Sequence, residues 1–115
     1  MKGFLRRHTL PNSVAIGFWK IISMDISYRA SRAVVTLAAY VNEAAYDANP
    51  NEAIISADCE CTSSDFTTHF EAAALSPVNK EPERNAYDFL QTLSAFIITS
   101  ETNSIDFTTG VTEVP

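Results

Sequence analysis

Two apolar segments separated by a short polar stretch constrain the fold more than any other feature of the sequence. Residues 14–24 are rich in branched and aromatic side chains, and their even-numbered positions are apolar except for Lys20. Residues 33–41 show a similar pattern, and such two-residue periodicity is typical of β-strands. Residues 25–32 between them are polar and short enough for an antiparallel connection. The sequence therefore predicts a β-hairpin in the first third of the chain.

A third strand is predicted over residues 53–61. Its apolar positions Ile55, Ala57, Cys59 and Cys61 alternate with the polar positions Ser56, Asp58 and Glu60. This alternation is typical of a strand with one face toward a core and one toward solvent. Residues 42–52 contain Asp, Asn and Pro, so they predict a loop with at most one helical turn near Glu43.

Two short helices are expected in the second half of the chain. Residues 63–65 offer N-cap side chains, and the apolar spacing after them predicts a helix that ends at Leu75. Pro82 and Glu83 predict the start of a second helix. Its apolar stripe consists of Ala86, Phe89, Leu90 and Leu93. Residues 96–99 would form a short last strand. The sequence thus predicts an α+β fold: a small antiparallel β-sheet built on the N-terminal hairpin, with one or two short helices packed on it.

Both ends of the chain are polar with scattered apolar residues, which predicts extended terminal arms. A chain of 115 residues corresponds to one domain. We expect an N-terminal arm over residues 1–12, a single α+β domain over residues 13–99 and an extended tail over residues 100–115. Such arms could dock on a neighbouring molecule or add a strand to its sheet. In that case, deletion of the tail should leave the domain folded; the alternative is that each arm folds back on its own domain.

The candidate interface residues come from these arms and from the only tryptophan. Trp19 lies opposite the more regular apolar face of its predicted strand. It would anchor a partner if that face is exposed, and it would belong to the core if the sheet is covered on both faces. The full set consists of Phe4, Leu5, Arg6, Arg7, Trp19, Ile105, Phe107 and Val111.

The sequence contains no recognisable catalytic or metal-binding motif. The three glycines, Gly3, Gly17 and Gly110, are too far apart for a G-x-G-x-x-G or Walker-type phosphate-binding loop. The pair Cys59-x-Cys61 lacks the spacing of zinc sites, even with His8 and His69 as further ligands, so the cysteines are read as small buried side chains. We therefore expect no enzymatic activity, no cofactor, no metal and no small-molecule substrate.

The net charge of −6 is unevenly distributed along the chain. Residues 1–32 contain six Lys and Arg against one Asp, a net charge of +5, and residues 33–115 carry a net charge of −11. This distribution permits head-to-tail contact between copies, although folding can also mix the two halves. The acidic balance argues against nucleic-acid binding, and no apolar run is long enough for a membrane helix. The absence of a disulfide framework fits a reducing compartment such as cytoplasm.

The order of the sequence motifs resembles that of small, poorly characterised virion proteins of tailed bacteriophages. The resemblance covers residues 14–93. It rests on Gly-Phe-Trp-Lys-Ile at 17–21, Asp25 with a basic turn, the strand at 33–40 and the helix at 85–93. It implies a tail or baseplate subunit rather than a capsid protein, made in the host cytoplasm and located in the virion, with other virion proteins and copies of itself as partners. The alternative is a small acidic protein that binds and inhibits or regulates a host protein.

Overall fold

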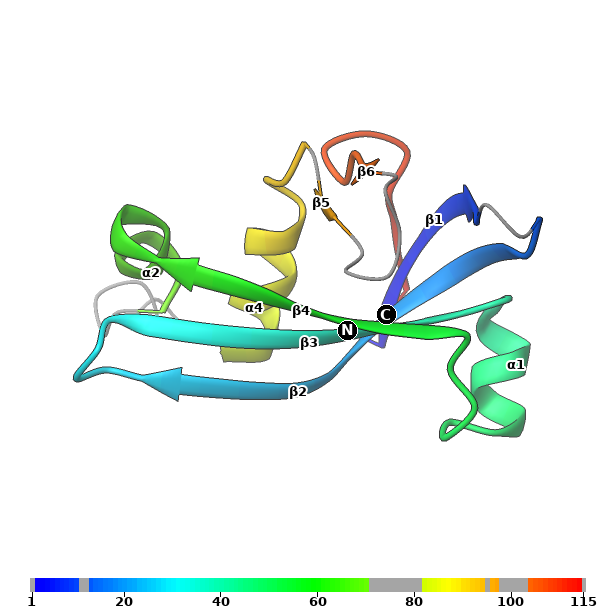
Figure 1. Cartoon of the computed structure of the whole chain (residues 1–115), viewed down its shortest axis with the longest axis horizontal. Coiled ribbons are helices and arrows are strands. Elements are labelled where there is room, and N and C mark those ends of the chain that lie inside the picture. Colours follow the sequence, from blue (N-terminus) through cyan, green and yellow to red (C-terminus); the bar gives the residue numbers. More distant parts are fainter. Residues whose placement is uncertain (1, 11–12, 71–81, 95, 98–103, 115) are drawn as a thin grey trace.

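The protein forms a five-stranded antiparallel sheet with three short helices packed on it, which confirms the expected α+β fold (Figure 1). The computed structural model describes residues 2–10, 13–70, 82–94, 96–97 and 104–114. The elements are β1 (Gly3–Thr9), β2 (Ala15–Ser27), β3 (Arg32–Tyr40), α1 (Glu43–Ala48), β4 (Ile55–Thr62), α2 (Ser63–His69), α4 (Pro82–Leu90), β5 (Phe96–Ile97), β6 (Ser104–Ile105) and β7 (Thr112–Val114).

The main sheet has the strand order β4-β3-β2-β1-β7. The predicted hairpin is confirmed as β2 and β3, which pair antiparallel from Phe18↔Tyr40 to Ser27↔Arg32. The predicted third strand is confirmed as β4, which pairs with β3 along its whole length. A separate two-stranded sheet joins β5 to β6.

One face of the sheet carries the main hydrophobic core, and we call it the core face. The helices α2 and α4 and the β5–β6 segment lie on this face (Figure 1). The helix α4 begins at Pro82 as expected, and its predicted apolar stripe is confirmed. Ala86, Phe89 and Leu90 are buried in the core, and Leu93 is partly buried against it.

The helix α2 differs from its prediction at the start. Its N-cap is Thr62, which makes no side-chain capping bond, and Ser63 to Asp65 form the first turn instead. The expected end of this helix at Leu75 and the last two residues of the expected strand 96–99 lie outside the described residues.

A β-bulge in β2 corrects the expected apolar face of this strand. The register against β3 shifts between Ile21 and Ser23. Trp19 and Ile21 contact the main core before the bulge, Met24 does so after it, and Ile22 is 53% exposed. A strict two-residue period cannot hold across a bulge, because the extra residue changes which face the following side chains occupy.

The second face of the sheet, which we call the open face, is covered among the described residues only at one end, by α1 (Figure 1). Phe18, Ala38 and Tyr40 are buried there, with Tyr46 of α1 packed against them. Asn42 caps α1 by accepting a hydrogen bond from the backbone N–H of Ala45 at 2.8 Å. The predicted single helical turn is therefore a short capped helix.

The expected N-terminal arm is wrong, because residues 3–9 form β1 inside the sheet. Phe4 is fully buried and contacts the rings of Trp19, Tyr87 and Phe107, with centroid distances of 6.5, 5.9 and 5.2 Å. Gly3 permits the close approach of β1 to β2, since a Cβ at this position would lie 2.7 Å from the ring of Phe18. The apolar side chain of the presumed arm thus lies within its own domain.

The expected C-terminal tail is also wrong in its described part. Ile105 and Phe107 are each 1% exposed and belong to the main core. The strand β7 pairs with β1, and the backbone N–H of Lys2 donates to the carbonyl oxygen of Val114 at 2.8 Å. Both ends of the chain fold back onto the domain, because the core offers their apolar side chains more contact than solvent does.

Candidate functional site

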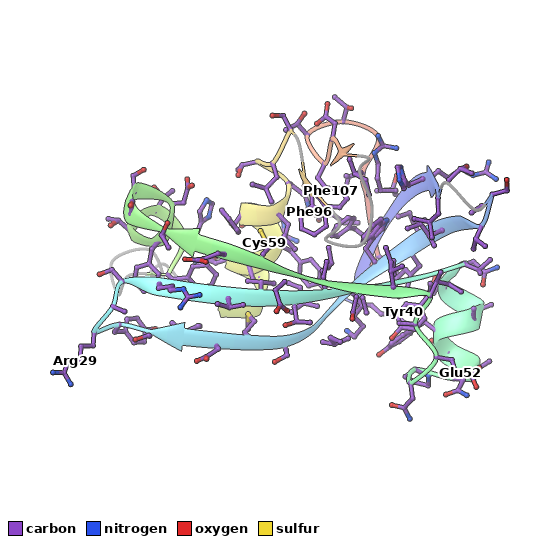
Figure 2. The ribbon with its side chains drawn as sticks, viewed as in Figure 1. Arg29, Tyr40, Glu52, Cys59, Phe96 and Phe107 are labelled. Atoms are coloured by element: carbon purple, nitrogen blue, oxygen red, sulfur yellow. The ribbon has the colours of Figure 1, made fainter. Side chains whose placement is uncertain are left out.

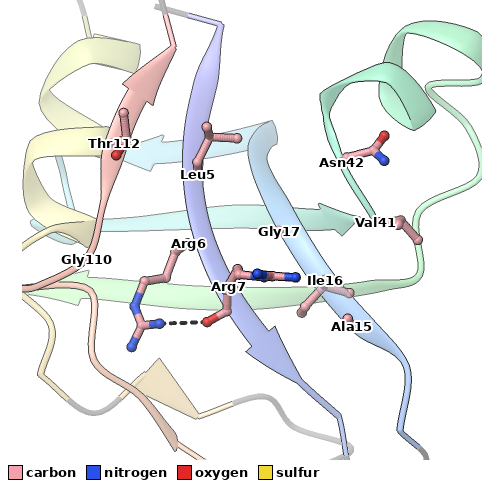
Figure 3. Close-up of a pocket in the computed structure, with 10 residues that line it drawn as sticks. All are labelled: Leu5, Arg6, Arg7, Ala15, Ile16, Gly17, Val41, Asn42, Gly110 and Thr112. Carbon is pink, nitrogen blue, oxygen red and sulfur yellow. Dashed lines mark hydrogen bonds between the residues drawn. The ribbon is translucent and has the colours of Figure 1, made fainter.

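A pocket of about 570 Å³ opens on the open face beside β1 and the first residues of β2 (Figure 3). This size lies within the range of roughly 300–1,000 Å³ typical of ligand sites. We call it the β1–β2 pocket. It is lined by Leu5, Arg6, Arg7, Ala15, Ile16, Gly17, Val41, Asn42, Gly110 and Thr112.

The pocket lies beyond the end of β3, where β2 pairs with β1 but no longer with β3. Pairing between β2 and β3 begins at Phe18, so residues 15–17 of β2 extend past the end of β3. Gly17 keeps the space beside Val41 free, because a Cβ at this position would lie 3.1 Å from the carbonyl oxygen of Val41. On the other side, Thr112 of β7 is the register partner of Leu5 on β1. Strand register therefore positions most of the pocket wall.

Arg6 is held in place by backbone carbonyl groups. Its Nε donates to the carbonyl oxygen of Asp106 at 3.0 Å, and one terminal nitrogen donates to that of Arg7 at 2.6 Å (Figure 3). The pKa of Asp106 lies below its usual value, first because the hydroxyl and backbone N–H of Thr108 donate to it, with a smaller contribution from the charge of Arg6. Arg6 thus links β1 to the segment that leads into β7.

Arg7 differs from Arg6 in that its side chain is exposed. Within the described part of the chain, no carboxylate forms an ion pair with Arg7. Leu5 and Val41, which line the same pocket, are 38% and 48% exposed. The pocket therefore combines exposed apolar surface with a positive charge that is available to a ligand.

The predicted interface residues divide into two groups in the structure. Leu5, Arg6 and Arg7 line the β1–β2 pocket, and Val111 is partly buried against the core next to it. The other four, which are Phe4, Trp19, Ile105 and Phe107, are at most 1% exposed. For Trp19, the core alternative holds, and its indole N–H donates to the carbonyl oxygen of Arg6 at 2.8 Å.

Sequence reasoning missed the part of the pocket formed by Gly17, Val41 and Asn42. A glycine inside a strand pattern is a signal of close backbone approach, and Gly17 carried this signal. Val41 and Asn42 carried none, since their place beside β1 depends on how far β2 extends past β3.

The cysteines lie on the core side of β4. Burial raises the pKa of the Cys59 thiol to about 11 and that of Cys61 to about 12, with a further contribution from the nearby Asp65 carboxylate. Such thiols stay protonated at neutral pH and are poor nucleophiles. No group of three or more His, Cys, Asp or Glu side chains suited to a metal ion occurs among the described residues. His8 lies on β1, three strands away from β4 in the sheet order.

The two acids on β4 are exposed, as their pattern predicted. Asp58 accepts a hydrogen bond from the hydroxyl of Thr36 at 2.7 Å, and Glu60 pairs with Arg32 at 3.0 Å. Both interactions run along the surface of the sheet. The two carboxylates do not line the β1–β2 pocket.

No protein-family model, curated protein or solved structure matches this chain. None of the helices in the described ranges has the length and hydropathy needed to cross a lipid bilayer.

Proposed function

We propose that the protein is a binding subunit that docks a partner protein on the β1–β2 pocket. The observation that carries this proposal is the exposure of Leu5 and Val41 beside Arg7, which forms no ion pair with a carboxylate of the described residues. Arginine is enriched at protein interfaces, where its guanidinium binds carboxylates and its stem packs on apolar groups. The pocket therefore suits a partner segment that presents an apolar side chain next to an acidic one.

The wider setting that we propose is a tailed-phage virion, with tail or baseplate preferred to capsid. The motif order of residues 14–93 supports this setting, and a surface for protein–protein binding is what a particle subunit needs. Extended arms no longer serve as the docking device, because β1 and β7 pair within the main sheet and Phe4, Ile105 and Phe107 are buried in the same molecule. The sheet surface takes over that role in the proposal.

The setting is tested by mass spectrometry of purified particles from a phage that carries the gene. The chain should occur in a fixed ratio to the other structural proteins, as symmetric assemblies require. A chain found in the infected cell but missing from the particles would refute the virion setting.

The docking surface is tested by complementation of a phage that lacks the gene. Arg7→Glu should reduce incorporation of the chain into particles, because it reverses the available charge of the pocket. Arg29→Glu is the matched control, since Arg29 lies at the tip of the β2–β3 hairpin, far from the pocket, and is also exposed (Figure 2). Circular dichroism should show both variants folded. Equal incorporation of both would exclude the β1–β2 pocket as the docking surface.

A further inference from the structure

The strand β4 forms one long edge of the main sheet. It pairs with β3 over Ile55–Thr62, and in the described part of the chain no strand pairs with its other side. In an edge strand, the backbone N–H and C=O groups of alternate residues point away from the sheet and can pair with a further strand. The opposite edge is formed by β7, which has only three residues.

We propose that the outer edge of β4 binds an extended, basic segment of a partner protein as an added strand. Addition of a strand to an open edge is a common mode of peptide recognition, in which backbone hydrogen bonds give affinity and alternate side chains give specificity. The chemistry of β4 selects the side chains of the partner on both faces.

On the open face, β4 presents the carboxylates of Asp58 and Glu60. They occupy alternate positions of the strand and are exposed. On the neighbouring strand β3, the hydroxyl of Thr36 donates to Asp58 and the guanidinium of Arg32 pairs with Glu60. An added strand with Lys or Arg at alternate positions would place these cations opposite the two carboxylates. Opposite charges at facing positions of neighbouring strands are stabilising.

On the core face, β4 presents apolar side chains that are only partly covered. Ile55 and Cys59 are half-buried at the margin of the main core. Apolar residues at the alternate positions of an added strand would complete their burial. The preferred segment therefore alternates basic and apolar residues.

A second copy of the chain is a less suitable occupant of this edge. Antiparallel pairing of two β4 strands around Cys59 would place Asp58 of each copy opposite Glu60 of the other. Like charges at facing positions are destabilising, so the same acids that favour a basic segment disfavour self-pairing.

The test uses the full chain labelled with ¹⁵N and two synthetic peptides, one that alternates Lys with Val and one that alternates Glu with Val. The Lys–Val peptide should shift the amide resonances of residues 55–62 and slow the hydrogen exchange of their outward N–H groups. The Glu–Val peptide should not. N-methylation of the Lys–Val peptide on one edge should abolish binding, because it removes the backbone donors that pair with β4.

Charge-neutral variants test the role of the two acids. Asp58→Asn and Glu60→Gln together should weaken binding of the Lys–Val peptide roughly three- to tenfold, as expected from two exposed charge pairs. Glu52→Gln is the control, because Glu52 is exposed on the loop before β4 and should leave binding unchanged (Figure 2). Arg7→Glu should also leave it unchanged, which separates this edge from the β1–β2 pocket.

Three results would overturn the proposal. One is equal binding of the Glu–Val peptide, and another is binding of the Lys–Val peptide with shifts confined to residues outside β4. The third is a stable dimer, seen by sedimentation of the free chain, in which the outward amides of β4 are already protected from exchange.

Discussion

Replacement of Phe107 by alanine tests whether the C-terminal segment is part of the core. The ring of Phe107 lies 5.2 Å from that of Phe4, 5.2 Å from that of Trp19 and 5.1 Å from that of Phe96, and the residue is 1% exposed (Figure 2). Loss of a buried phenylalanine costs about 3–5 kcal/mol. Three aromatic contacts, each worth about 0.5–1.5 kcal/mol beyond area burial, place the expected loss in the upper half of that range.

The assay is urea unfolding followed by far-UV circular dichroism. The free energy of unfolding should fall by about 4 kcal/mol, which is a large part of the roughly 5–15 kcal/mol that stabilises a typical domain. Thr109→Ala is the matched control, since Thr109 is exposed in the same segment and its replacement should change the free energy by less than about 0.5 kcal/mol. A loss below about 1 kcal/mol for Phe107→Ala would refute the packing of this segment and would favour the terminal tail expected from the sequence.

Further predictions concern the helix, an ion pair and the thiols. Leu90→Ala should lower the free energy of unfolding by about 2–5 kcal/mol, because Leu90 is fully buried; a change near zero in urea titration would contradict the packing of α4. Glu113→Gln should cost less than about 1 kcal/mol, because the ion pair with Arg84 is exposed on both sides. The Arg84 guanidinium holds the pKa of Glu113 below its usual value, so the difference between wild type and variant should vanish as the pH falls through this lowered pKa; a difference that persists in acid would exclude the ion pair as its cause. Between pH 9 and 11, stability should fall with rising pH, because the pKa of Cys59 is raised from 9.0 to about 11 and that of Cys61 to about 12, so the unfolded thiols lose their protons first. A variant with alanine at both cysteines should show a shallower decrease in thermal unfolding at these pH values, and an unchanged slope would refute the assignment.

Local patterns predicted the elements whose partners are close in sequence. The hairpin followed from the alternation in residues 14–24 and 33–41, and α4 followed from Pro82 and the apolar stripe after it. The sequence did not predict which side chains of β2 face the core, because the bulge after Ile21 depends on pairing with β3. A sequence period shows that a strand exists but not where its register shifts.

The two ends of the chain were misread for a different reason. Residues 3–9 include two arginines and one buried aromatic residue, and β1 has its own register shift between Leu5 and His8. The strand β7 has only three residues. Neither segment has a strong local pattern, and their pairing joins positions more than a hundred residues apart, which a short window of sequence does not reveal. The same limit applies to the β1–β2 pocket. The sequence indicated Arg6 and Arg7 as interface residues, but it did not indicate that Val41 lies beside them.

The pairing of β1 with β7 also determines when the protein can fold during its synthesis. Phe4 and Trp19 emerge from the ribosome long before their ring partner Phe107. Until then, the nascent chain has a hairpin with a large apolar face and no cover for part of it. Contacts between distant segments also slow folding after release. The growing chain therefore exposes this apolar surface until β7 pairs with β1.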